Sequence, residues 1–160
     1  MGLFEQMTPN EARLTVLAVG AVGAALFTQH VLGMKPCPWC VLQRILFLLI
    51  ATVALAGAII PKRWAQIAGS ALVMPVAAGG IAAALYQHFV AAKSASCNLT
   101  FADKVIGAFS LDSRWPDMFE VRANCADAAT NLLGVPYEFW SLALFAMAAA
   151  AALWVIRSDV

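Results

Sequence analysis

Charged side chains leave four long gaps along the chain, at residues 14–34, 45–61, 64–92 and 139–156. A helix that crosses a membrane needs about 20 mostly apolar residues, because the hydrocarbon core is about 30 Å thick. Each gap supplies one such helix once its edges are adjusted, and we expect spans near 13–32, 41–60, 65–90 and 137–156. The pattern predicts an all-α membrane protein, a four-transmembrane-helix bundle that forms a single integral membrane domain over residues 1–160.

The composition favours this interpretation over a soluble protein with buried helices. Hydrophobic residues make up 62% of the 160 residues and charged residues 12%, against roughly 45–50% and about 25% in soluble domains. Four buried helices would leave too little polar surface. The net charge of +1 gives no reason to expect nucleic acid as a partner. No small-residue cleavage site follows the first apolar run, so we expect that span to be retained rather than removed as a signal peptide.

Four spans place both termini on one side of the membrane and two loops, near 33–39 and 91–136, on the other. Basic residues occur on both sides, so their number does not decide the orientation. The short turn with Lys62 and Arg63 is the densest basic patch, which favours the terminal side as cytoplasmic. In a bacterium this places the chain in the inner membrane with both loops in the periplasm.

All four cysteines fall in or beside these two loops: Cys37, Cys40, Cys97 and Cys125. An even number on one face is typical of disulfide chemistry in an oxidising compartment. Two inert staples are the structural alternative, and for Cys97 and Cys125 it stays open. For Cys37-Pro38-Trp39-Cys40 it is weak, because so small a loop removes little entropy from the unfolded chain. The C-x-x-C spacing suits redox cycling, since one thiol can release a mixed disulfide formed by the other.

The C-x-x-C motif lies where the second span begins. The free N–H groups and the dipole of a helix N-terminus favour an anion, so a thiolate at Cys40 would be stabilised there. Arg44 follows one helical turn later on the same face. An arginine within an apolar span indicates a functional site, although a side chain that reaches the interface is the alternative. We expect Arg44 to stabilise the Cys40 thiolate and to donate to an oxygen of a bound electron acceptor.

His88 ends the third span at the same membrane face as Cys40. It is a candidate second donor to the acceptor or a proton source, with a hydrogen-bonded interfacial histidine as the alternative. A c-type haem site is excluded because Val41, not histidine, follows Cys40. Zinc is disfavoured because the second cysteine pair lacks the C-x-x-C spacing and the compartment is oxidising.

The longer loop contains apolar residues at helical spacing. These are Phe101, Val105, Ile106 and Phe109, and then Trp115, Met118 and Phe119, followed by Arg122. The spacing predicts short amphipathic helices that lie on the membrane surface. Ordinary packing of the loop against the bundle is the alternative.

The order of these features resembles disulfide bond formation protein B (DsbB), a family of quinone-linked oxidases of the bacterial inner membrane. The shared pattern is C-x-x-C at the start of the second of four spans, followed in order by Gln43-Arg44, Gln87-His88, the paired loop cysteines and Gly134-Val135-Pro136 before a last span containing Trp140. The resemblance covers essentially the whole chain. The related vitamin K epoxide reductases have the opposite cysteine order. The chain departs from the family at 128–131, where Ala-Ala-Thr-Asn replaces a segment that often contains tryptophan.

The resemblance implies a role for each site residue. Cys97 is similar to the cysteine attacked by a reduced, soluble, thioredoxin-fold DsbA-like oxidase, and Cys125 to its disulfide partner. Cys37 resembles the thiol that exchanges with Cys125, and Cys40 the thiolate beside the quinone, ubiquinone or menaquinone. Arg44 resembles the arginine that contacts the quinone. His88 resembles a residue near it.

The implied function is a dithiol:quinone oxidoreductase that reoxidises the DsbA-like partner. A DsbA disulfide is strongly oxidising, at about −120 mV, so its regeneration needs a strong terminal oxidant. A quinone dissolves in lipid and can meet a reactive pair at a helix end. Two alternatives remain: an oxidase dedicated to one substrate, and a four-span scaffold protein with two inert loop disulfides.

Overall fold

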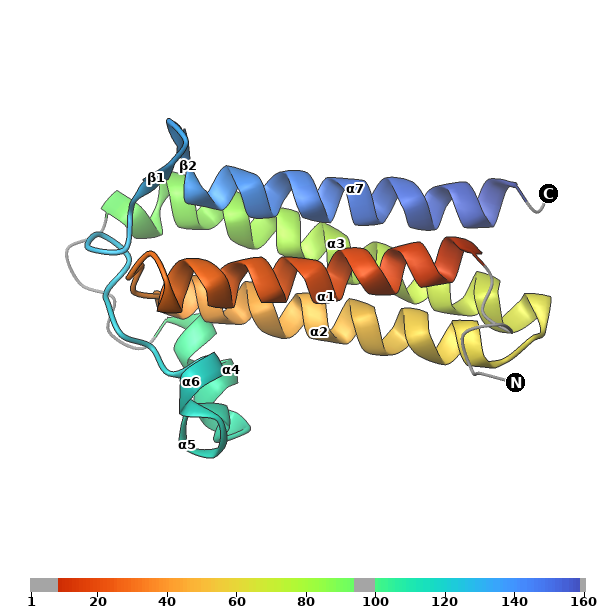
Figure 1. Ribbon diagram of the computed structural model, residues 1–160, viewed down its shortest axis with the longest axis horizontal. Coiled ribbons are helices and arrows are strands. Elements are labelled where there is room, and N and C mark those ends of the chain that lie inside the picture. Colours follow the sequence, from red (N-terminus) through yellow and green to blue (C-terminus); the bar gives the residue numbers. More distant parts are fainter. Residues whose placement is uncertain (1–8, 94–99, 159–160) are drawn as a thin grey trace.

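Four long helices form the protein in a computed structural model that describes residues 9–93 and 100–158. Each is long and apolar enough to cross a membrane. Their axes run side by side, and α1 begins at the end of the bundle where α7 finishes (Figure 1). The predicted four-helix architecture is confirmed, with these bounds: α1 Pro9–His30, α2 Pro38–Ile59, α3 Arg63–Phe89 and α7 Tyr137–Arg157.

Helix α2 begins three residues before the expected position, and proline is the reason. Pro38 is its first residue. Proline suits the first turn of a helix, because its φ is already helical and its missing N–H would have no partner there. The earlier start of α2 places Cys37 at its N-cap and Cys40 within its first turn.

The helices pack as a ring in which α1 contacts α2, α2 contacts α3, α3 contacts α7, and α7 contacts α1. The core contains mostly small and aliphatic side chains, including Ala18, Ile50, Ala54 and Ala77. Small residues allow close approach of helices in lipid, where apolar burial itself gives little driving force. One aromatic pair crosses the ring: Phe47 and Phe145 stack with ring centroids 3.9 Å apart.

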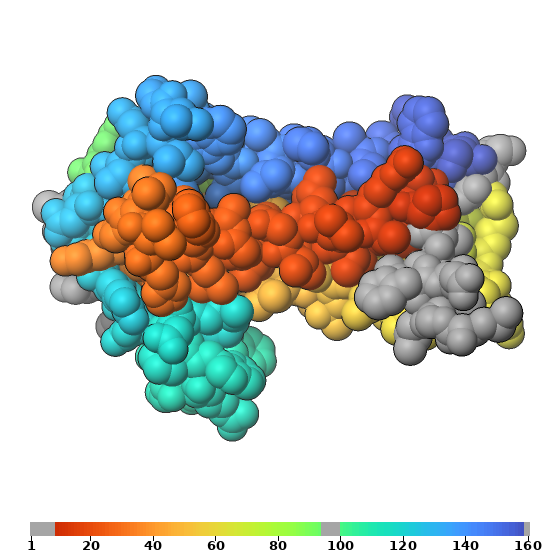
Figure 2. All heavy atoms as spheres, viewed as in Figure 1, coloured from red at the N-terminus to blue at the C-terminus, as the bar shows by residue number. Residues whose placement is uncertain are grey.

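The loop between α3 and α7 contains the predicted short helices, and it packs against the bundle as well. A 3₁₀ turn at Ala91–Lys93 follows α3, and three helices come next: α4 Phe101–Ala108, α5 Leu111–Arg114 and α6 Pro116–Phe119. Buried Ile106 and Phe119 pack against Val41 of α2, whereas Phe109 and Trp115 are exposed. The segment stands out sideways near the end of the bundle where α2 begins (Figures 1 and 2).

A small hairpin before α7 was not predicted. Strands β1 Asn131–Leu132 and β2 Val135–Pro136 pair antiparallel. Leu133 and Gly134 connect them with φ values of 55° and 82°. Positive φ at both central residues is the geometry of a type I′ turn, which matches the twist of paired strands. The hairpin leads into α7 at Tyr137, whose N–H donates to the carbonyl of Thr130 over 3.0 Å.

We expect Gly80→Ala to destabilise the bundle at the contact between α3 and α7. A Cβ at Gly80 would overlap the ring of Phe145, which is fully buried. Overpacking of this kind costs about 1–3 kcal/mol. Gly79→Ala is the matched control, since nothing lies within 4 Å of a Cβ added there. Thermal unfolding in detergent, followed by circular dichroism, should show a lower midpoint for Gly80→Ala alone. Equal midpoints for the two variants would contradict this packing.

Candidate redox site

The C-x-x-C motif forms the first turn of α2. Cys37 is the N-cap, and its sulfur accepts a hydrogen bond from the backbone N–H of Cys40 over 3.3 Å. The two Sγ atoms lie 2.9 Å apart. Cys37 is fully buried, while Cys40 is partly exposed. The pair therefore combines one shielded sulfur with one that remains accessible at the helix end.

Cys125 joins this pair although it lies far away in the sequence. It is buried in one cluster with Cys37, Trp39 and Leu42. The adjoining segment is held to the first loop, because the N–H groups of Arg122 and Ala123 donate to the carbonyl of Pro36 over 3.0 and 3.3 Å. The two cysteine-bearing loops are thus joined by backbone hydrogen bonds. Cys97, the fourth predicted site residue, lies outside the described residues.

The surroundings of Cys37 favour its neutral thiol. A hydrogen bond with Cys125 is the largest cause that raises its pKa well above the ordinary value, followed by a hydrogen bond with Cys40 and by burial. Each of these favours S–H over the thiolate. A raised pKa means that Cys37 reacts slowly as a nucleophile at neutral pH, because the thiolate is the reactive form.

Cys40 lines a cavity of about 160 Å³ between α1, α2 and α7. Its walls are mainly apolar, from residues such as Ala21, Phe47 and Leu144, with Arg44 and Trp140 among the polar ones. The indole N–H of Trp140 donates to the carbonyl of Leu132 over 3.1 Å, which turns the ring toward the hairpin. A cavity of this size holds a single benzene ring in a soluble protein.

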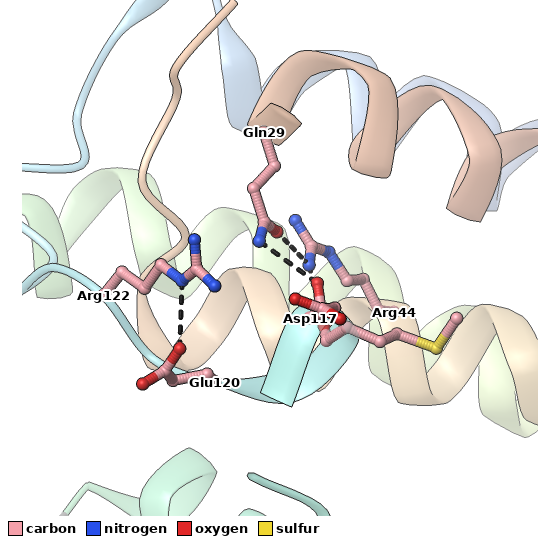
Figure 3. A network of polar contacts seen from close by, with 6 residues as sticks. Gln29, Arg44, Asp117, Glu120 and Arg122 are labelled. Atoms are coloured by element: carbon pink, nitrogen blue, oxygen red, sulfur yellow. Dashed lines mark hydrogen bonds and ion pairs between the residues drawn. The ribbon is translucent and has the colours of Figure 1, made fainter. Parts of the chain in front are cut away.

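Arg44 is buried within the protein rather than extended to the membrane surface. Its side chain is 5% exposed. Nη1 donates to Oε1 of Gln29 over 2.6 Å and to the carbonyl of Met118 over 2.8 Å. Gln29 in turn donates through Nε2 to the carbonyl of Asp117 over 3.2 Å. Figure 3 shows the guanidinium between Gln29 of α1 and the backbone of α6. These acceptors argue against the alternative of an interfacial anchor.

One donor of this arginine is left over. Arg44 Nε is buried and has no hydrogen-bond partner among the described residues. The same side chain lines the cavity next to Cys40. A separate, exposed ion pair, Arg122 Nε to Glu120 Oε2 at 3.1 Å, lies nearby in the same view (Figure 3).

Two buried glutamines complete the surroundings of Cys40. Nε2 of Gln87, on α3, donates to Cys40 Sγ over 3.3 Å. Oε1 of Gln87 accepts from Nε2 of Gln43, on α2, over 2.7 Å. From the sequence, both residues stood out only as part of a family pattern. The available signal was their chemistry, since an amide in an apolar span is costly unless it is hydrogen-bonded.

His88 is at the predicted level of the bundle but does not line the cavity with Cys40 and Arg44. Its Nδ1 lies 2.6 Å from Oε1 of Glu138, a buried residue in the first turn of α7. Its ring packs against Phe89 and Phe139. The structure therefore brings Cys37, Cys40, Cys125 and Arg44 together and places His88 in a separate pair between α3 and α7.

The chain is similar to known proteins over most of its length. A family model described as disulfide bond formation protein DsbB matches residues 12–155. The chain belongs to the DsbB family. Disulfide bond formation protein B 1 of Pseudomonas putida is 34% identical over 137 residues, which cover 85% of this chain and 82% of that protein. The Polaromonas naphthalenivorans protein is 33% identical over 149 residues, which cover 89% of each chain. The Azoarcus sp. protein is 31% identical over 157 residues, or 92% and 94% of the two chains.

Membership of the DsbB family identifies the protein as a multi-pass membrane protein of disulfide bond formation, and the family implies a disulfide-forming oxidoreductase. The four apolar helices and the clustered sulfurs are the parts that such an activity requires. Trp140 of α7 places an indole in the lining of the cavity.

We expect Cys37 in the fully reduced protein to be alkylated only at pH values above those typical of an exposed cysteine. Its raised pKa keeps the thiol protonated until that pH is passed. Cys125→Ala removes the largest cause of the shift, so the onset should move to lower pH. Iodoacetamide labelling across pH, followed residue by residue with mass spectrometry, measures both curves. An onset that Cys125→Ala leaves unchanged would show that Cys125 does not set this pKa.

Proposed function

We propose that this protein is a membrane dithiol:quinone oxidoreductase that reoxidises a soluble periplasmic DsbA-like oxidase and passes the electrons to a membrane quinone. The observation that carries the proposal is the arrangement of sulfurs. Cys125 and Cys37 belong to one buried cluster, and Cys40, next to Cys37, lines an apolar cavity with Arg44. Thiols in this arrangement can transfer a disulfide by exchange from Cys125 in the loop to Cys40 at the cavity.

The lining of the cavity suits a quinone head group by its chemistry. Its apolar walls suit a ring that arrives from lipid, and Nε of Arg44 is a buried donor that has no acceptor among the residues the structure describes. Arg44 and Trp140 are the residues that would hold the head group, ubiquinone or menaquinone. A quinone supplies an acceptor for two electrons and two protons. Arg44, which lines the cavity, would supply a fixed positive charge to stabilise negative charge on the oxygen of a bound acceptor.

The thiol steps follow from disulfide exchange. A thiolate of the reduced partner attacks Cys97 of a Cys97–Cys125 disulfide, and Cys125 leaves with the electron pair as a thiolate. That thiolate attacks Cys37 of the Cys37–Cys40 disulfide, forming a Cys37–Cys125 bond and releasing Cys40 as a thiolate. The partner's second thiolate then resolves its mixed disulfide with Cys97. Two electrons have then moved from the partner to the chain, and the partner is oxidised.

The fold stabilises the released Cys40 thiolate in two ways. Cys40 lies in the first turn of α2, where the helix dipole and free N–H groups favour negative charge. Arg44, one turn further along, adds a buried positive charge. The raised pKa of Cys37 agrees with this division, because it makes Cys40 rather than Cys37 the sulfur that leaves the disulfide as a thiolate.

The same proposal fixes the orientation of the bundle in the bacterial inner membrane. The cysteine-bearing loops would face the periplasm, where the partner resides and disulfides persist. The ends of α1 and α7 that lie away from the cysteines would face the cytoplasm, together with the basic turn at Lys62 and Arg63.

We expect purified protein in detergent to reduce ubiquinone or menaquinone in step with oxidation of a reduced DsbA-like partner. Cys37→Ser should abolish the reaction, because Cys125 then has no disulfide to attack. The measurement is quinone absorbance together with the partner's thiol content. Thr52→Ala, at an exposed position of α2 outside the cavity lining, is the control and should retain activity. If the folded protein reduces neither quinone, the scaffold alternative with inert disulfides takes its place.

We expect Arg44→Lys to raise the KM for quinone about tenfold, which corresponds to about 1.4 kcal/mol of lost binding, with a smaller change in kcat. Lysine keeps a positive charge but cannot match the planar set of donors that serves Gln29, Met118 and the cavity together. Initial rates over a range of quinone concentrations separate the two constants. An unchanged KM would mean that Arg44 binds Gln29 and Met118 but does not contact the quinone.

A further inference from the structure

We infer that Gln87 is a catalytic residue that stabilises the Cys40 thiolate by hydrogen bonding, and that Gln43 is a positioning residue that orients the Gln87 amide. This inference rests on the proposed role of Cys40 as the sulfur released beside the acceptor. It starts from two consecutive hydrogen bonds, Gln43 Nε2 to Gln87 Oε1 at 2.7 Å and Gln87 Nε2 to Cys40 Sγ at 3.3 Å.

The chemistry of sulfur fixes the direction of this chain. A disulfide sulfur or a thiolate has no proton, so it can only accept a hydrogen bond. The Gln87 amide must then turn its NH₂ group toward Cys40 and its carbonyl away. Gln43 satisfies that carbonyl with its own N–H, which opposes rotation of the Gln87 amide. The orientation is held by a second side chain rather than by Gln87 alone.

The burial of Gln43 and Gln87 increases the energetic contribution of each hydrogen bond. Both glutamines are buried, and they come from facing helices, α2 and α3. With little water at this depth, a donor lost from a charged acceptor is not replaced, and hydrogen bonds to charged groups are worth more than neutral ones. Gln87 approaches Cys40 from α3, whereas Arg44 extends along α2 toward α1 and α6. The thiolate would thus receive a dipole from one helix and a charge from another.

Other titratable or charged groups lie near Cys40. They are Cys37 and Cys125 in the sulfur cluster, Arg44 on α2, Tyr137 on α7 and Lys35 in the first loop. The test therefore uses a background in which Cys37, Cys97 and Cys125 are serine, so that Cys40 is the sole thiol. Arg44, Tyr137 and Lys35 are then the same in every protein compared.

The experiment measures the rate at which iodoacetamide alkylates Cys40 as a function of pH. Gln87→Met has similar length and no donor, and we expect it to move the midpoint of the curve upward by about one pH unit, since the thiolate loses a stabilising contact. Gln66→Met, toward the other end of α3, is the matched control and should leave the midpoint unchanged. An unchanged midpoint in Gln87→Met overturns the inference.

A double-mutant cycle tests the positioning role of Gln43. Gln43→Met should raise the midpoint by a smaller amount, about half a pH unit, because Gln87 can then rotate. Gln43→Met with Gln87→Met should equal Gln87→Met alone, since Gln43 acts only through Gln87. Shifts that add would overturn that role. If Gln87→Met is not monodisperse in detergent, Gln87→Asn gives the same reading, because the shorter amide cannot reach the sulfur.

These measurements need neither quinone nor partner, so they separate the inference from the proposed function. A shifted midpoint in a protein that reduces no quinone would show that Gln87 stabilises the Cys40 thiolate and would overturn the proposed oxidase function. Quinone reduction with an unshifted midpoint would keep the oxidase and remove the role of Gln87.

Discussion

A guanidinium buried among apolar helices has to find its acceptors inside the protein. Water is scarce there, and an unsatisfied charged donor is expensive. Arg44 meets this requirement with Gln29 of α1 and with the carbonyl of Met118 in α6. The other parts of the cysteine-bearing end are positioned by these contacts of Arg44. The long loop between α3 and α7 comes back to the bundle at α6, and the segment that carries Cys125 follows directly from it.

This arrangement links two parts of the proposed reaction that are distant in sequence. Met118 belongs to the loop that would receive electrons from a soluble partner, and Arg44 lines the cavity that would deliver them to a quinone. A displacement of α6 would remove an acceptor from Arg44, and Gln29 would lose the carbonyl of Asp117 at the same time. The position of the loop and the position of the positive charge beside Cys40 are therefore coupled. The hydrogen bonds from Arg122 and Ala123 to Pro36 attach the segment before Cys125 to the loop that carries Cys37.

The parts of the site that sequence reasoning predicted are those governed by local rules. Gaps between charged residues predict membrane spans because the hydrocarbon core excludes charge. C-x-x-C at the start of a helix predicts a redox pair because the cysteine spacing and the helix N-terminus both act within one turn. The acceptors of Arg44 lie 15 and 74 residues away from it, and no periodicity connects them. The same limit applies to His88. Its level in the bundle followed from the length of α3, but its pairing with Glu138 depends on how α3 and α7 face each other. The hairpin at 131–136 was missed because two-residue strands are too short for an alternating pattern.

The groups around Cys40 also divide by charge in a way that suits a sulfur that changes state. In the proposed reaction Cys40 would alternate between a neutral disulfide and an anionic thiolate, and each state would have to be tolerated at the same site. A second fixed positive charge in direct contact would stabilise the thiolate but would be left uncompensated in the disulfide. A neutral amide donor such as Gln87 can serve both states, because a disulfide sulfur also accepts its N–H, only more weakly. Arg44 avoids the same difficulty because its charge is already solvated by Gln29 and Met118 when the sulfur is neutral. Gln29 and Met118 thus compensate the charge of the arginine independently of Cys40, which leaves the sulfur free to change charge.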